Sequence, residues 1–110
     1  MLSVWVREWL EGDSIRVEKY LGSSLISREW RKDGRLHREG GPAVERFYPD
    51  GRISCREWRI GGELHREDGP AYEDFYGDGS PRYFLWYHRG RRHRREGPAE
   101  EVFAPQGKVV

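Results

Sequence analysis

The histidine and arginine pairs are the residues of this chain whose types could do chemistry, and they recur in one motif. HREGGPA begins at His37, and close copies begin at His65 as HREDGPA and at His93 as HRREGPA. A His-Arg pair ahead of a carboxylate could serve acid–base chemistry, whereas Gly-Pro-Ala could form a turn between strands. The motif therefore reads either as a site or as an architectural joint, and the spacing of its copies bears on the choice.

The copies belong to an internal repeat with a step of 28 residues. Trp30, Trp58 and Trp86 keep the same step, and residues 28–55 match residues 56–83 at 17 of 28 positions without a gap. The third copy is looser, as expected of a terminal unit that caps an array. The sequence predicts one domain, 1–110, with a divergent N-terminal cap at 1–27 and units at 28–55, 56–83 and 84–110.

Composition favours a folded chain with a thin, aromatic-rich core, because 35% of the residues are charged but 14% are aromatic. The formal net charge of +1 implies no polyanionic partner for the molecule as a whole. A single cysteine, Cys55, excludes an internal disulfide framework and fits a reducing compartment. The first residues show neither a basic n-region nor a long apolar run, so the sequence predicts a cytoplasmic protein without a membrane span.

Hydrophobic alternation with period two predicts strands. In AVERFY, Ala43, Glu45 and Phe47 share one face, and the turn sequence at 49–51 leads into a second β-rich run. A short turn follows each Trp, then a brief extended piece that ends at Gly-Pro. No segment carries a helical stripe of useful length. The expected fold is all-β, an antiparallel β-meander of stacked 28-residue hairpin repeats.

These residues carry a resemblance to a known family. Tyr48-Pro49-Asp50-Gly51, then Glu57-Trp58, then Gly62-Glu63-Leu64-His65 resembles the MORN repeat, and the HRxxGPA string resembles MORN-variant repeats of phage, giant-virus and bacterial proteins. The unit here is longer, and Arg28 and Arg56 stand where MORN units often have Gly. The resemblance implies an elongated sheet of hairpins that binds partners without catalysis, with inhibitor or antitoxin-like relatives.

The repeated histidines do not suit a shared metal site. Equivalent atoms in neighbouring units of two or three strands should lie roughly 10 to 14 Å apart, whereas zinc holds nitrogen at about 2.0 to 2.1 Å. The sequence therefore predicts no metal at His37, His65 and His93. We expect each imidazole to hydrogen-bond the backbone of the Gly-Pro-Ala corner beside it.

The repeated arginines leave two interpretations open. Arg38, Arg66 and Arg94 could form an ion-pair ladder with Glu45, Glu73 and Glu101, which recur at the same period. They could instead offer guanidinium groups to an anionic ligand, with Trp30, Trp58 and Trp86 available to stack on a base. The second interpretation favours a nucleotide or short nucleic acid over a sugar or a lipid.

The third unit departs most from the repeat. Residues 81–95 hold six arginines, two histidines and no acid, and Arg92 replaces the leucines of the earlier units. The stretch is either a solvated cap or a partner surface. Its candidate binding residues are Arg89, Arg91, Arg92, His93, Arg94 and Arg95.

No nucleophile motif, phosphate loop or metal-ligand spacing predicts an enzyme or a cofactor, although a hydrolase acting through His and Glu is a weaker third class. The leading hypothesis is a non-catalytic module that recognises another protein. The alternative is a protein that sequesters a nucleotide or short nucleic acid. Because FAPQGKVV stops where a second strand should begin, we also expect association through a C-terminal sheet edge.

Overall fold

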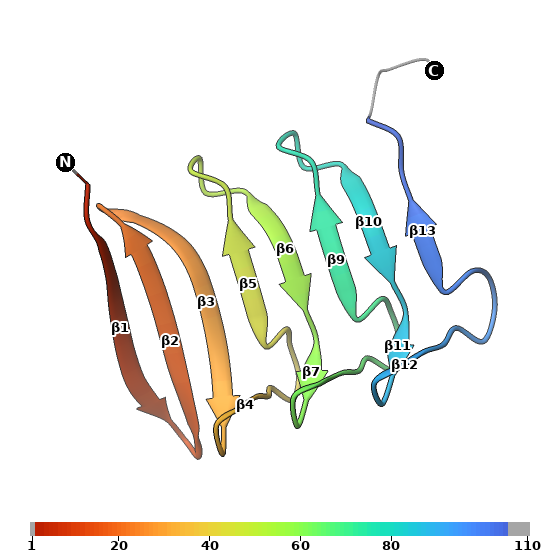
Figure 1. Cartoon of the computed structure of the whole chain (residues 1–110), viewed down its shortest axis with the longest axis horizontal. Coiled ribbons are helices and arrows are strands. Elements are labelled where there is room, and N and C mark those ends of the chain that lie inside the picture. Colours follow the sequence, from red (N-terminus) through yellow and green to blue (C-terminus); the bar gives the residue numbers. More distant parts are fainter. Residues whose placement is uncertain (1, 106–110) are drawn as a thin grey trace.

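The chain forms one long antiparallel sheet and two short ribbons (Figure 1), in a computed structural model that describes residues 2–105. The strand order is β1-β2-β3-β5-β6-β9-β10-β13, with β4 paired to β3, and β7-β8 and β11-β12 pair separately. The all-β antiparallel class predicted from the sequence is confirmed. The strands are β1 (Val4–Glu11), β2 (Ser14–Leu21), β3 (Ser24–Lys32), β4 (Arg35–Leu36), β5 (Val44–Phe47), β6 (Ile53–Glu57), β7 (Arg59–Ile60), β8 (Glu63–Leu64), β9 (Tyr72–Phe75), β10 (Pro81–Leu85), β11 (Tyr87–His88), β12 (Arg91–Arg92) and β13 (Glu100–Val102).

Strands of the first and second units begin 28 residues apart: β9 follows β5, and β10 follows β6, at that step. β5 and β6 form one hairpin and β9 and β10 another, each closed by the turn sequence that the alternation predicts. Gly51 and Gly79 in these turns have φ of 91° and 90°, a region that glycine enters without steric cost. The first and second units therefore each contribute one such hairpin to the sheet, whereas the third adds β13 within the described residues.

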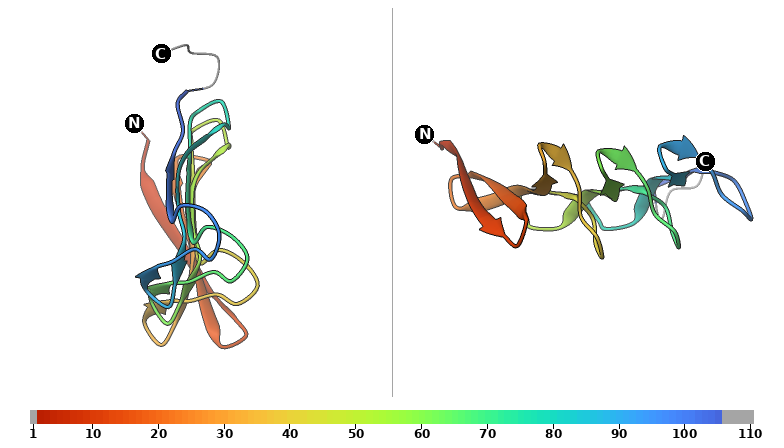
Figure 2. Two further views of the ribbon diagram at one scale, coloured as in Figure 1. Left: turned by 90° about the vertical axis from the view of Figure 1, so that its right-hand side faces the viewer. Right: turned by 90° about the horizontal axis from the view of Figure 1, so that it is seen from below.

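Short hairpins follow the tryptophans. Their two-residue loops have positive φ at both positions, as a type I′ turn requires. The loops are Asp33-Gly34, Gly61-Gly62 and Arg89-Gly90. Seen from below, the short hairpins project from one side of the sheet and the corner loops that hold the repeated motif project from the other (Figure 2).

The sheet is a single layer, so its core is thin, with principal extents of 41 × 35 × 16 Å. Burial is greatest where the corner loops return to the sheet: Ala43 and Ala71 are fully buried, and Val44 beside them is 1% exposed. Trp30 and Trp58 donate their backbone N–H groups to the carbonyls of these two alanines. The small side chain of alanine allows this close approach.

A row of alternating charges crosses the sheet beside this core. Arg28 pairs with Glu18 at 2.8 Å and with Glu45 at 3.3 Å, and Arg56 pairs with Glu73 at 2.8 Å. In the third unit Phe84 takes the equivalent position and packs on Phe75, Trp86 and Phe103 with ring centroids 5.2 to 6.3 Å apart. No helix within residues 2–105 is long and apolar enough to cross a membrane.

Candidate functional site

The repeated arginine of each corner loop lies on the tryptophan of its own unit. The guanidinium carbon is 3.7 Å from the ring centroid for Arg38 on Trp30, and 3.8 Å for both Arg66 on Trp58 and Arg94 on Trp86. Each guanidinium also donates a hydrogen bond of 3.1 to 3.2 Å to the carbonyl of the motif's own proline. The arginine therefore ties the loop to the sheet by a cation–π contact and a hydrogen bond.

The glycine before the proline makes room for this arginine. A Cβ built on Gly69 would lie 2.7 Å from the guanidinium carbon of Arg66, and the equivalent distances are 3.0 Å at Gly41 and 3.1 Å at Gly97. At Gly69 the guanidinium would have to shift, and at Gly41 and Gly97 it would have to give way by a few tenths of an ångström. The glycine therefore leaves room for the arginine to stack where it does.

The histidine of the motif joins one unit to the next. Nδ1 of His37 accepts the N–H of Gly61 at 2.9 Å, and Nδ1 of His65 accepts the N–H of Arg89 at 3.0 Å. The prediction of a backbone partner was right in kind but wrong in place, because the partner lies in the β-turn of the following unit. The motif loop projects from the sheet, and its imidazole therefore meets the turn of the following unit and not the Gly-Pro-Ala corner beside it. His93 has no such donor within residues 2–105.

The expected ion-pair ladder of the motif arginines forms in two of the three units. Arg66 reaches Glu73 at 3.5 Å and Arg94 reaches Glu101 at 3.0 Å, whereas Glu45 pairs with Arg28 instead of Arg38. All three arginines share the stacking on tryptophan and the hydrogen bond to the proline carbonyl. The stacking covers one face of each indole, so a base could not stack there.

The arginine-rich stretch of the third unit meets acids from elsewhere in the chain, contrary to what its local sequence indicates. Arg82 pairs with Asp74 at 2.7 Å, and Arg92 pairs with Glu100 at 3.2 Å. Arg94 pairs with Glu101 in the same way, so three of the six arginines in residues 81–95 form ion pairs. Arg89, Arg91 and Arg95 make no ion pair among the residues that the structure describes.

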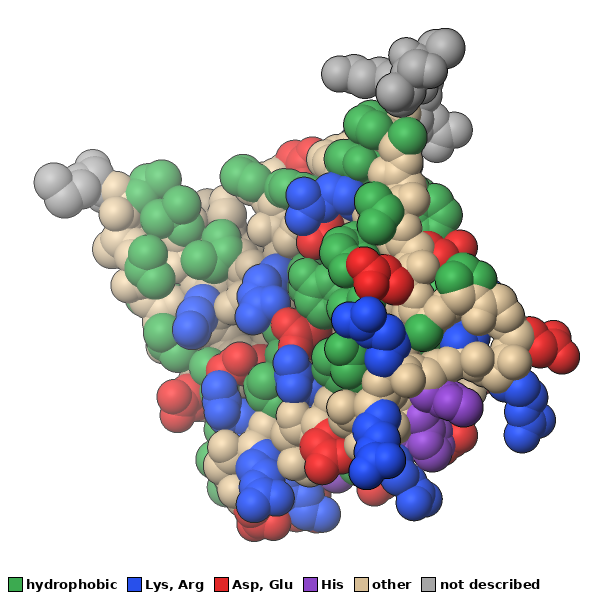
Figure 3. Space-filling model, turned by 45° about the vertical axis from the view of Figure 1, so that its right-hand side comes forward, with side chains coloured by type: hydrophobic (Ala, Val, Ile, Leu, Met, Phe, Trp, Pro, Cys, Tyr) green, Lys and Arg blue, Asp and Glu red, His purple; other side chains and the backbone are tan. Residues whose placement is uncertain are grey.

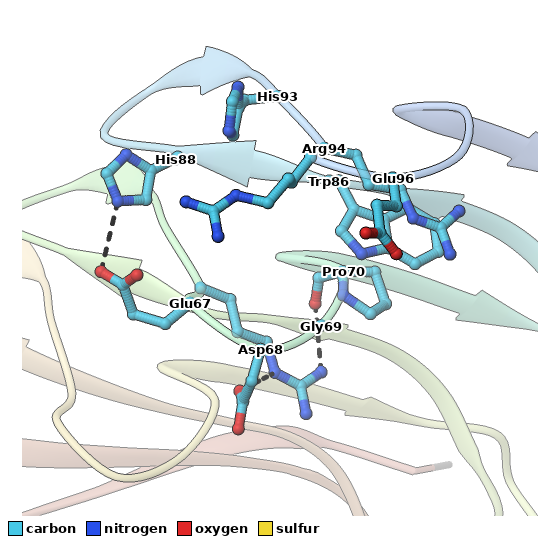
Figure 4. A pocket seen from close by; sticks show the side chains of 11 residues that line it. Glu67, Asp68, Gly69, Pro70, Trp86, His88, His93, Arg94 and Glu96 are labelled. Atoms are coloured by element: carbon cyan, nitrogen blue, oxygen red, sulfur yellow. Dashed lines mark hydrogen bonds and ion pairs between the residues drawn. The ribbon is translucent and has the colours of Figure 1, made fainter.

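An open groove of about 840 Å³ lies between the corner loops of the second and third units (Figure 4). Glu67 projects from one wall toward His88 on β11, and its Oε1 is 3.2 Å from Nε2 of His88 and 3.1 Å from Nε2 of His65. Hydrogen bonding to His88 lowers the pKa of the Glu67 carboxyl. The ring centroids of His88 and His93 are 6.0 Å apart.

Sequence reasoning missed the part played by His88 in this cluster. It compared only the equivalent histidines His37, His65 and His93, which lie in different units. His88 stands where the earlier units have Lys32 and Ile60, so the break in the repeat was the available signal. The loop that carries Glu67 then brings His65 and His88 together, with ring centroids 4.6 Å apart.

The N-terminal hairpin presents an apolar face that the sequence analysis did not single out. Val4 pairs with Leu21, Val6 with Lys19, Glu8 with Val17 and Leu10 with Ile15, so this face is mainly apolar and carries two charged residues, Glu8 and Lys19. Val4, Val6 and Leu10 are 64%, 48% and 78% exposed. On the opposite face Trp5 stacks on Tyr20 at a centroid distance of 4.2 Å and remains 39% exposed.

The one cysteine is not an activated nucleophile in this environment. Cys55 is buried on β6, and burial raises the pKa of its thiol, which keeps it protonated at neutral pH. Comparison with known proteins adds no assignment: the chain matches no protein-family model, no curated protein and no solved structure.

Proposed function

We propose that this chain is a non-catalytic β-repeat module that binds another protein through its N-terminal hairpin. The observation that carries the proposal is the apolar face of β1 and β2, where large side chains stay exposed on one side of an edge strand. Figure 3 shows hydrophobic side chains gathered over this end of the molecule. Exposed apolar clusters of this kind mark interaction surfaces.

The partner that fits is a protein that offers an extended strand. Within residues 2–105, β1 pairs only with β2, so the outer backbone groups of an eight-residue strand are open to strand addition. A partner strand with alternating apolar side chains would extend the row of Val4, Val6 and Leu10. Backbone hydrogen bonds would supply affinity and the apolar row would set the register.

A second copy of the chain is a weaker occupant. Joining β1 of one copy to β13 of another would leave an open edge at each end, and such a head-to-tail contact does not close. The strand β13 also has only three residues. Self-association through the C-terminal edge therefore stays a competing prediction, and residues 106–110, which bear on it, lie outside the described part of the chain.

The repeated residues support this assignment indirectly, because their side chains are already engaged in structural contacts. The motif arginines and histidines hold the corners together, which leaves the places where the repeat breaks for recognition. The MORN-like resemblance favours binding without catalysis, and we extend it to an inhibitor or antitoxin-like role in the cytoplasm. Capture of a nucleotide would need free indole faces, and co-purified nucleotide absorbing near 260 nm would favour that alternative.

Site-specific photo-crosslinking tests the proposal in cells that make the protein. A crosslinking amino acid at Val6 or Leu10 should capture one distinct protein, whereas the same group at Arg91, far along the molecule on β12, should not. Capture from Val6 should be lost when Leu10→Lys is added, because the change removes the most exposed apolar side chain of the row. Position 91 samples the arginine-rich surface of the third unit.

Three outcomes would overturn the proposal. The first is no capture from either apolar position, and the second is capture of only another copy of this chain. The third is equal capture from Arg91, which would place recognition on another surface.

A further inference from the structure

We propose that His65, Glu67 and His88 bind a divalent first-row transition cation, with zinc as the test ion, at the junction of the second and third units. This site is separate from the N-terminal hairpin and does not depend on the proposed protein-binding function. Figure 3 shows the histidine side chains grouped at the molecular surface beside an acidic side chain.

The geometry of the cluster carries the proposal. One nitrogen of each histidine and one carboxylate oxygen all lie within 4.8 Å of one another. Oε1 of Glu67 is 3.1 Å from Nε2 of His65 and 3.2 Å from Nε2 of His88. Tetrahedral zinc with bonds of about 2.0 to 2.2 Å separates its ligand atoms by roughly 3.3 to 3.5 Å, so small movements would complete three positions.

The ligand types select the class of cation. Two imidazoles and one carboxylate suit zinc and its first-row neighbours, whereas calcium and magnesium prefer oxygen ligands alone. Three protein ligands leave a further position for water or an incoming group. The open groove gives access to it, and His93 lies next to His88 on the same side (Figure 4).

The cluster forms at only one junction within the described residues. At the first junction His37 and Glu39 repeat two of its members, but Ile60 stands in place of His88. In the third unit Arg95 lies two residues after His93, at the position where the earlier units have Glu39 and Glu67. The first junction therefore serves as an internal control, because it has two of the three ligands and lacks the third.

Metal binding has a distinctive consequence for the turn of the third unit. Nδ1 of His65 accepts the amide proton of Arg89, so the proton of the neutral ring is on Nε2. A metal at Nε2 requires that proton to move to Nδ1, and the Arg89 amide then loses its acceptor. The equivalent bond from Gly61 to His37 should be unaffected.

The experiment is calorimetric titration of the untagged protein with zinc chloride, followed by amide NMR. We expect one zinc per chain and a shifted Arg89 amide signal with an unchanged Gly61 signal. His88→Ile installs the residue that the preceding unit carries, so folding should persist while affinity falls by at least about tenfold. Ile60→His should create a second site and raise the stoichiometry to two.

Absence of zinc binding in the unaltered protein would overturn the inference. So would an affinity that His88→Ile leaves unchanged, because the metal would then sit elsewhere. Circular dichroism of each variant establishes that a lost site reflects lost ligands, and a failure here would leave the hairpin crosslinking result untouched.

Discussion

In the first two units the histidine, arginine, glycine and alanine of the HRxxGPA motif each have a structural task. Arginine stacks on tryptophan, glycine makes room for it, alanine packs at the buried corner, and histidine reaches the next unit. The sequence showed that these positions are equivalent and favoured a structural role for the histidines. It could not show which turn each imidazole would meet, because that depends on the direction in which the loop projects. For the same reason His88 was missed as a partner of His65.

The role of the motif glycine predicts that Gly69→Ala destabilises the protein. The added methyl group would collide with the Arg66 guanidinium and push it off Trp58. We expect the free energy of unfolding to fall by about 1 to 3 kcal/mol, as in other overpacked sites. Urea denaturation measures this, with Gly77→Ala as the matched control, since a Cβ there meets nothing within 4 Å. Equal losses in both variants would refute the role assigned to Gly69.

At the scale of strands, rows of paired charged side chains help to hold neighbouring strands together. In two-layer proteins a thick apolar core has this role. Alternation in the sequence predicted the hairpins and their turns, because inward and outward residues of a strand differ in type. It did not predict which charges pair, since pairing depends on register across strands far apart in the chain. Glu45 meets Arg28 because β3 and β5 are neighbours.

The buried carboxylate of Glu18 should make the sheet sensitive to acid. Burial alone would raise its pKa, but hydrogen bonds from Tyr20 at 2.7 Å and Arg28 at 2.8 Å outweigh burial and lower the pKa below its ordinary value. A carboxyl with a lowered folded-state pKa adds stability above its unfolded pKa and loses it as the pH falls. The free energy of unfolding should therefore decrease as the pH is lowered through the carboxylate range.

The variant Glu18→Gln tests this source of acid sensitivity. We expect a cost of about 1 to 3 kcal/mol at neutral pH, because charge-assisted hydrogen bonds are lost, and a flatter decline in acid. Glu8→Gln on the exposed strand β1 serves as the control. If Glu18→Gln keeps the full decline, other carboxylates are responsible.

At the scale of the whole molecule, units add side by side into one thin sheet with two edges. The repeat in the sequence predicted this arrangement, since each unit must pair with its neighbours to satisfy its backbone. The exposed face of the N-terminal hairpin was not predicted, because residues 1–27 carry only an echo of the repeat. The function proposed here depends on that departure from the repeat.

The proposed strand addition is tested most directly by amide hydrogen exchange. The protein is measured alone and in complex with the partner that crosslinking identifies. Strand addition predicts slower exchange along Val4–Glu11, because amides on the outer side of β1 gain acceptors, and little change in β5, β6 and β9. Unchanged exchange in β1, with new protection around Arg89–Arg95 instead, would contradict the account and assign recognition to the third unit.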